Sequence, residues 1–501
     1  MGYIQRQAIK NNLIAYLSLG VGAVAQVFVY PLDLELKGFA DALVKYATLL
    51  YPFATLGVGS VMVRYVSHLD VPPQRARRQL FARLMLVVLA FLAVIGVLLL
   101  LLGDRVVALA LARGWQLGVL LEYPWTVYAL TVSLALAALL TTNLANYNRV
   151  AIPVAFNSLL IKVGLPVLVL LVVYDYVTLP LFVGGLVGLY AVATLGLLVY
   201  SRLIGAARVD LSPLAAPRPL RREMADMALF SIFGLIGSSL VTSIDVVVIN
   251  NFQTDRATAI FTFGLFVAAT MKIPAKAINM ISLSKVSALL QARDHAALRS
   301  LYRDSATVLL VAGLLLYGGM VLCLPYFYQL TSGTLQYAPG YLVVVFLGLG
   351  MLFDLVTSIN GSIINYSDDY RWNVGFVLFA GLLNFALNYL AIVVLDLGIT
   401  GAAASSAVSL LLYNAIKVGF VHRRIGIHPF TGRQLVIVLL NLLLWAVIYP
   451  VPDLAPAPVM LVLKGGALVV ASALVYGLTP LVPSVRELLR AVPGRFRKPR
   501  T

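Results

Sequence analysis

The chain has 501 residues and a formal net charge of +17, and 61% of its residues are hydrophobic, whereas only 11% are charged. Soluble domains carry about 25% charged residues, so this composition excludes an ordinary soluble protein and indicates an all-α, polytopic membrane protein. The basic residues form no stripe interleaved with aromatic residues on a soluble domain, which excludes nucleic-acid binding. No metal-ligand spacing occurs, and no metal site is expected.

Fourteen apolar stretches have about the length that a membrane span needs. They cover residues 10–32, 41–66, 80–102, 119–143, 150–173, 178–202, 226–250, 257–284, 305–325, 339–365, 372–394, 398–421, 434–450 and 458–479. With the connecting segments assigned alternately to two sides, 27 of the 37 basic residues fall on one side, four on the other and six within spans. The positive-inside rule then places both termini in the cytoplasm.

The chain divides into two six-span halves. We expect an N-terminal lobe at 1–203, a Pro-rich basic linker at 204–225, a C-terminal lobe at 226–424, two further spans within 425–480 and a basic cytoplasmic tail at 481–501. A shift of 222 residues brings Pro52 onto Pro274 and Arg149 onto Arg371. Both halves start on the same side, so they form a parallel repeat, and such repeats hold their substrate between the halves near mid-membrane. The sequence therefore predicts two pseudo-symmetric lobes around a central cavity.

Charged side chains within spans mark candidate sites, because each must face protein or water. Lys272 and Lys276 stand one helical turn apart on either side of Pro274, which predicts two cations beside a helix kink. They suit an anionic headgroup, although pairing with Asp245 or Asp354 is the structural alternative. Lys162 would add a cation from the other half, in a cavity or in a structural pair. Pro52 predicts a second kink.

Carboxylates and amides within spans allow further interpretations. Asp245 and Asp354 suit either proton or sodium coupling or the pairing of lysines. Asn360, Asn384 and Asn388 suit either a polar cavity lining or hydrogen bonds between helices. Lys417 lies near the inner end of its span, where its side chain is expected to reach the membrane surface.

Several stretches resemble a known transporter family. They are 260–263 with 272–277, 346–348 with 353–354, 359–361, 370–373, 398–403, and 51–53 with 56–59. Over most of residues 8 to 430, the chain resembles the oligosaccharide flippases of the polysaccharide-transporter branch of the multidrug/oligosaccharidyl-lipid/polysaccharide exporter superfamily.

The resemblance implies a bacterial inner-membrane flippase that moves a polyprenyl-diphosphate-linked oligosaccharide, such as an O-antigen or exopolysaccharide repeat unit, by alternating access. It implies a monomer surrounded by lipid, with polysaccharide polymerase machinery as a partner. Lys272, Lys276 and Lys162 would then hold the diphosphate. No P-loop is present and no cofactor is expected.

Three other functions were weighed. A lipid II flippase has similar substrate chemistry. A multidrug and toxin extruder shares the fold, but a cationic drug calls for cavity carboxylates. A membrane glycosyltransferase or ligase is disfavoured, because the external loop from Tyr326 to Ala338 carries no charge. We therefore expect a transporter, not an enzyme.

Overall fold

The structure is a computed structural model that describes residues 3–69, 71–112, 118–212 and 216–483. Throughout these ranges the regular secondary structure is helical and no strand occurs. Eleven of the described helices are long and apolar enough to cross a membrane, or twelve if the bent pair α2 (Leu34–Thr55) and α3 (Val58–Tyr65) counts as one span. A multi-pass, all-helical membrane protein is thereby confirmed.

Two compact units divide the chain, Met1–Ala259 and Ile260–Thr501. Besides α2 and α3, the first unit holds α1 (Tyr3–Phe28), η1 (Tyr30–Leu32), η2 (Val66–His68), α4 (Pro73–Ala112), α5 (Val119–Glu122), α6 (Pro124–Asn146), α7 (Ala151–Val154), the π-helical segment η3 (Ala155–Leu160), α8 (Ile161–Val173), α9 (Leu179–Leu203) and α10 (Arg218–Phe252). The division falls inside α11 (Asp255–Ala269).

The second unit continues with α12 (Lys272–Gln291), α13 (His295–Tyr328), α14 (Ser332–Leu335), η4 (Ala338–Gly340), α15 (Tyr341–Val356), α16 (Ile359–Tyr366), α17 (Arg371–Tyr389), the π-helical segment η5 (Leu390–Val394), α18 (Gly398–Ile425), α19 (Gly432–Ile448) and α20 (Ala457–Leu478). At its centre, α15 packs against α13 and α18, and α13 also packs against α19 and α20. Tyr302, Leu309 and Ile437 are fully buried in this core.

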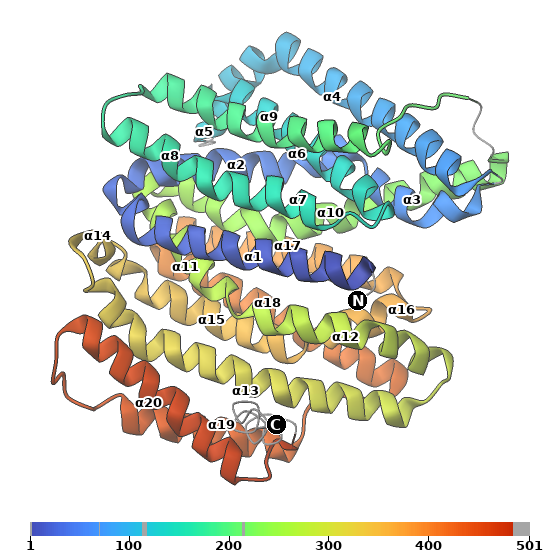
Figure 1. Cartoon of the computed structure of the whole chain (residues 1–501). Coiled ribbons are helices and arrows are strands. Elements are labelled where there is room, and N and C mark those ends of the chain that lie inside the picture. The colour runs from blue at the N-terminus through green and yellow to red at the C-terminus, as the bar shows by residue number, and fades with distance from the viewer. Residues whose placement is uncertain (1–2, 70, 113–117, 213–215, 484–501) are drawn as a thin grey trace, which may run out of the picture. The chain divides into compact units, whose positions relative to one another are not determined.

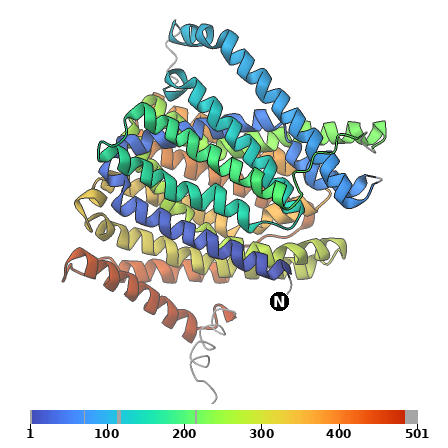
Figure 2. The ribbon, with the colours of Figure 1, turned by 45° about the horizontal axis from the view of Figure 1, so that its top comes forward.

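The first unit is built around α2, which packs against α6 and α10 (Figures 1 and 2). Leu43 of α2, Leu130 of α6 and Phe182 of α9 pack in one core cluster of this unit and are fully buried. Large apolar side chains also cover the outside, and Leu100 and Leu101 on α4 are each 69% exposed. A helix that is apolar on its outer as well as its inner face fits a lipid environment, not water.

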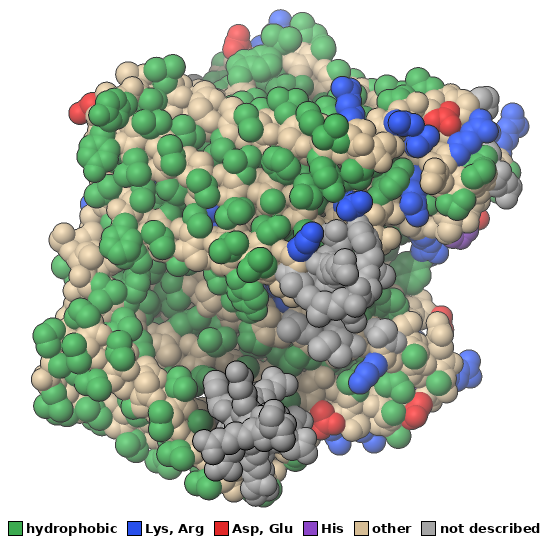
Figure 3. Space-filling view, viewed as in Figure 1, with side chains coloured by type: hydrophobic (Ala, Val, Ile, Leu, Met, Phe, Trp, Pro, Cys, Tyr) green, Lys and Arg blue, Asp and Glu red, His purple; other side chains and the backbone are tan. Residues whose placement is uncertain are grey.

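Basic side chains gather at one end of the first unit, over α3 and the beginnings of α4 and α10, whereas hydrophobic side chains cover most of its visible face (Figure 3). The described helices α4, α10 and α13 are longer than the spans we predicted, because each extends through polar and basic sequence at its beginning. Most of the predicted tail lies outside the described residues.

The second predicted span is broken after Thr55. Leu56 and Gly57 both adopt left-handed backbone angles, with φ of 48° and 66°, and the axes of α2 and α3 differ by 53°. A Cβ atom on Gly57 would lie 2.3 Å from the carbonyl oxygen of Ala228 on α10. Glycine is therefore required both for the φ value and for the close approach. Pro52 lies inside α2, one turn before this break.

The eighth predicted span is broken at Thr270 and Met271, between α11 and α12. Pro274 lies in the first turn of α12, where a backbone N–H has no partner within the helix, so proline costs little there. The tenth predicted span is likewise broken, between α15 and α16. Pro52 thus precedes the break nearest to it, whereas Pro274 follows its own.

The start of α2 differs from our prediction. Asp33 caps this helix by accepting a hydrogen bond from the backbone N–H of Leu36 at 2.9 Å, so the helix begins seven residues earlier than the predicted Asp41. Lys37, which we placed in an external loop, is consequently buried within the helix and only 5% exposed.

Candidate functional site

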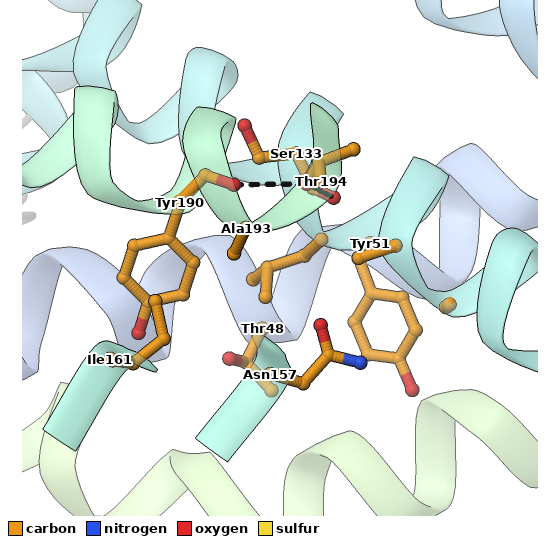
Figure 4. Close-up of a pocket in the computed structure, with 11 residues that line it drawn as sticks. Thr48, Tyr51, Ser133, Asn157, Ile161, Tyr190, Ala193 and Thr194 are labelled. Atoms are coloured by element: carbon orange, nitrogen blue, oxygen red, sulfur yellow. Dashed lines mark hydrogen bonds between the residues drawn. The ribbon is translucent and has the colours of Figure 1, made fainter. Parts of the chain in front are cut away.

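A cavity of about 240 Å³ lies within the first unit, among α2, α6, η3, α8 and α9 (Figure 4). Its lining consists of small, apolar, hydroxyl and amide side chains: Thr48, Tyr51, Ser133, Leu134, Ala137, Ala138, Asn157, Ile161, Tyr190, Ala193 and Thr194. The rings of Tyr51 and Tyr190 flank it, and Thr48 and Asn157 lie between them (Figure 4). None of these eleven residues is charged.

The threonine and serine hydroxyls of this cavity donate their hydrogens to nearby carbonyl groups. Thr48 Oγ1 donates to the carbonyl oxygen of Val44 at 2.7 Å, and Thr194 Oγ1 contacts the carbonyl oxygens of Tyr190 at 2.9 Å and Ser133 at 3.0 Å. Ser133 Oγ donates to its own helix at 3.0 Å. A hydroxyl oxygen that has donated its one hydrogen still has lone pairs to accept with. Each of these three hydroxyl oxygens therefore remains available as an acceptor.

Asn157 enters the cavity from the π-helical segment η3, where the helix is locally widened. Its Nδ2 donates to Thr141 Oγ1 at 3.0 Å, which leaves the amide oxygen as a further acceptor. Short π-helical segments inside α-helices occur frequently at functional sites.

A second cavity of about 560 Å³ adjoins the first, because Tyr51 and Ala138 line both. It lies at the bend between α2 and α3, is lined also by Thr142 of α6 and Met227 of α10, and contains one cation, Arg64. The two cavities are therefore neighbours within the first unit, and only the larger one is lined by a charged residue.

Four charged side chains cluster in the first unit outside these cavities. Lys37 pairs with Asp41 one turn later on α2 and lies over the ring of Tyr30 at 4.8 Å. Lys45 donates to the carbonyl oxygen of Thr242 on α10 at 2.8 Å, and Asp245 on the same helix is only 4% exposed. Asp245 therefore lies near Lys45, which is not one of the two lysines, Lys272 and Lys276, that we gave as its partners in the structural alternative.

In the second unit, the predicted cation Lys272 forms an ion pair with Asp354 of α15, with 3.8 Å between Nζ and Oδ2. Asn414 of α18 donates to the other carboxylate oxygen at 3.0 Å. The side chains of Lys272 and Asp354 remain 46% and 28% exposed. Lys276 lies one turn further along α12 and is exposed, and no ion pair joins it to a described carboxylate. The contact between Lys272 and Asp354 is the one that the structural alternative predicted, and both lysines lie in the first turns of α12, directly after a helix break.

The prediction that Lys417 reaches the membrane surface is wrong. This lysine is 6% exposed, donates to Tyr413 Oη at 3.1 Å and lies over the same ring at 4.6 Å. A Cβ atom on Gly361 of α16 would lie 3.4 Å from its ammonium nitrogen. Packing against the ring of Tyr413 therefore holds the Lys417 side chain inside the unit. The position of Lys417 along its predicted span did not indicate this contact.

The three predicted amides are buried. Asn360 Oδ1 accepts a hydrogen bond from the hydroxyl of Tyr302 at 3.1 Å, which joins α16 to α13. Asn388 Nδ2 bonds to Asn384 within α17 at 2.9 and 3.1 Å, to its carbonyl and side-chain oxygens respectively. None of the three lines either of the described cavities. Lys162 is half-buried in the first turn of α8, directly after η3.

Sequence analysis missed the uncharged cavity altogether. Charges within spans stand out in a sequence, whereas the polar side chains of this cavity are Thr, Ser, Tyr and Asn, which are common in any membrane helix. The one available signal was that Thr48 and Tyr51 of the second span and Ser133 of the fourth lie within apolar runs.

Comparisons with known proteins give a fold but no family. No family model and no curated protein matches the sequence. The solved structure of a lipid II flippase MurJ in an inward closed conformation matches with a TM-score of 0.68 at 14% identity, over 94% of this chain and 98% of that one. An inward-facing multidrug resistance MATE family transporter of the MOP superfamily matches with 0.56 at 14% identity, over 82% and 94% of the two chains.

A MATE in the bent conformation matches with a TM-score of 0.54, also at 14% identity, over 85% of this chain and 96% of that one. At such identities the matches establish a shared fold. This chain has the fold of these flippase and exporter structures over most of its length.

Proposed function

We propose that this chain, which has the fold of those flippase and exporter structures, is a transporter that flips a polyprenyl-diphosphate-linked oligosaccharide. The lipid-linked glycan enters from the cytoplasmic leaflet and leaves to the outer leaflet by alternating access. The fold supports a transporter, because it is shared with a lipid II flippase and with MATE transporters. The assignment of a lipid-linked glycan as the substrate rests on the chemistry of the candidate residues.

The observation that carries the proposal is the pair of lysines at the start of α12, directly after a helix break. Lys272 is partly exposed and is balanced by Asp354 alone at 3.8 Å among the described carboxylates, and Lys276 is exposed one turn away. A diphosphate that displaces Asp354 from Lys272 would contact two ammonium groups. The protein would lose only one weak ion pair in exchange. Lysine acts as a flexible point charge, which suits a headgroup that must bind and then leave.

The cavities of the first unit argue against a cationic drug. A cation held within a membrane requires carboxylates or other negative charge, and neither described cavity is lined by one; the larger contains Arg64 instead. These linings suit an uncharged or anionic substrate.

Lipid II flipping is the second candidate function. The MurJ structure matches with a TM-score of 0.68, compared with 0.56 and 0.54 for the MATE structures. Lipid II is also a polyprenyl diphosphate that carries sugars, so the same lysines would serve either substrate. The motifs that resemble the polysaccharide-transporter branch favour the oligosaccharide.

The proposal includes the topology and surroundings predicted from the sequence. It places fourteen spans in a bacterial inner membrane and both termini in the cytoplasm, with polysaccharide polymerase machinery as a partner. Length and apolarity alone do not identify three of these proposed spans. They are the bent pair α2 and α3, the pair α11 and α12 with its break, and the short helix α19.

Complementation of two bacterial strains tests the function. One strain lacks its lipid II flippase and the other its O-antigen flippase, and both receive this chain at the same membrane abundance. We expect surface glycan to return in the second strain. Growth restored only in the first strain would assign the chain to lipid II. Failure in both, with resistance to cationic drugs gained, would overturn the proposal.

A further inference from the structure

We infer that the uncharged cavity of Figure 4 binds one neutral sugar ring of the transported glycan, an inference that rests on the proposed function. The lysines of α12 would account for the diphosphate but leave the glycan without any recognising group. The first unit supplies such groups on four of its helical elements.

The hydrogen-bond capacity of the cavity fits sugar hydroxyls. Thr48, Ser133 and Thr194 have donated their hydroxyl hydrogens to carbonyl groups, so each oxygen faces a ligand as an acceptor. Asn157 likewise donates one amide hydrogen to Thr141, and its side-chain oxygen can still accept a hydrogen bond. A sugar hydroxyl can donate to all of these oxygens.

An anion does not fit the same lining. Phosphate and carboxylate groups only accept hydrogen bonds when ionised, and the eleven lining residues include no cation to balance their charge. A metal ion would find neutral oxygens but no carboxylate. The chemistry therefore selects a neutral ligand with several O–H groups.

The size and the side walls of the cavity agree with a single ring. Its volume of about 240 Å³ corresponds to about eight water molecules, which is room for one sugar ring and too little for a branched oligosaccharide. The rings of Tyr51 and Tyr190 flank this space (Figure 4). Aromatic side chains offer an apolar surface beside a polar hydroxyl, which suits the alternating C–H and O–H groups of a sugar.

The shape of α7 to α8 gives an independent reason. A regular helix would carry Asn157 at another angle, because the π-helical turn of residues 155–160 shifts the helix face. The cavity thus receives its only amide from the one described irregular turn within this span. Tyr51 also lines the larger cavity, whose lining includes Arg64, so the two cavities are neighbours.

Saturation-transfer NMR on the full chain in lipid nanodiscs tests the inference. The probes are the methyl glycosides of glucose, galactose, mannose, rhamnose and N-acetylglucosamine, with methyl glucuronide as a charged comparison. Two variants alter the cavity: Ala193→Leu fills it, and Asn157→Leu removes its amide at similar size. Asn157 is exposed, so this second variant keeps the test valid if Ala193→Leu does not fold.

Two other variants serve as controls. Thr131→Val removes a buried hydroxyl that bonds its own helix at 2.8 Å, as Thr48 does, but that lies outside the cavity. Lys272→Ala with Lys276→Ala removes the proposed diphosphate contacts. We expect at least one neutral glycoside to receive saturation. Its affinity should fall roughly threefold to tenfold in Asn157→Leu, as for one lost hydrogen bond, and should stay unchanged in both controls.

Two results would overturn the inference. Either no neutral glycoside receives saturation, or its signal in both cavity variants equals its signal in the wild-type chain. Preferential binding of methyl glucuronide or of sodium ions would equally contradict it. The proposed function fails separately, if the chain restores glycan export in neither strain while the sugar signal still depends on Asn157. Loss of export in the double lysine variant with an intact sugar signal supports both.

Discussion

Replacing Lys272 and Lys276 by alanine should abolish transport while leaving the fold intact. The Lys272–Asp354 pair spans 3.8 Å between side chains that are 46% and 28% exposed, and ion pairs of this kind contribute about 0–1 kcal/mol to stability. A hydrogen bond to a charged phosphate contributes about 1.5–3 kcal/mol. Each lysine that is lost should therefore reduce transport roughly tenfold to 150-fold, because about 1.4 kcal/mol corresponds to a factor of ten.

The assay is glycan export in the flippase-deficient strain, with each variant expressed to the same membrane abundance. Lys285→Ala is the matched control, since Lys285 is also an exposed lysine on α12 but lies three turns further along. Arginine at either position should retain part of the activity. Normal export by the double alanine variant would refute the diphosphate site, and an equal loss in Lys285→Ala would show that any reduction of positive charge has the same effect.

Three further predictions concern stability. Gly57→Ala should cost more than about 1 kcal/mol, because a Cβ atom would lie 2.3 Å from the carbonyl oxygen of Ala228 at a φ of 66°, whereas Gly184→Ala should cost nothing, since no atom lies within 4 Å; thermal unfolding in detergent compares them. Lys417→Met should leave the unfolding temperature unchanged or raise it, because replacing a buried charge by an apolar side chain of similar volume is often neutral; a fall of many degrees would show that the ammonium group itself stabilises α18. Hydrogen bonds from Ser212, with the nearby charge of Arg75, hold the pKa of Asp210 below its usual value of 3.8, so this carboxylate anchors its loop to α4 above about pH 4 and releases it as the pH falls further. The protection of residues 208–212 against hydrogen exchange, relative to their intrinsic rates, should therefore fall in acid, and Asp210→Asn should remove that pH dependence.

The class of the fold followed from the sequence because the membrane imposes it. Apolar runs and the distribution of basic residues predicted a polytopic helical protein, and the described helices agree. The interruptions were harder to predict. Pro274 lies near a break that occurs at Thr270 and Met271, while the break near Pro52 is made by Leu56 and Gly57, where the approach of α10 requires a glycine. That approach is a tertiary contact, which spacing along the chain does not encode.

The charged part of the candidate site was easier to predict than its uncharged part. Lys272 and Asp354 stand out within the predicted spans, because a charged side chain inside a membrane must face protein or water. The structure brings these two side chains together. Asn157, Thr48 and Thr194 are recognised as a group only in the structure, where a π-helical turn and three packed helices direct them into one cavity. Lys37 and Lys417 were misplaced because a helix cap and an aromatic ring decide their burial.

The most direct test of the central claim is transport in proteoliposomes. The purified chain is reconstituted with a polyprenyl-diphosphate-linked oligosaccharide labelled in its glycan, and a glycosidase added outside measures how much labelled glycan reaches the outer leaflet from within. We predict that the wild-type chain and Lys285→Ala expose the glycan at similar rates, and that Lys272→Ala with Lys276→Ala does not exceed the protein-free rate. A wild-type rate equal to that of protein-free vesicles, in vesicles where the chain moves a cationic drug, would contradict the account.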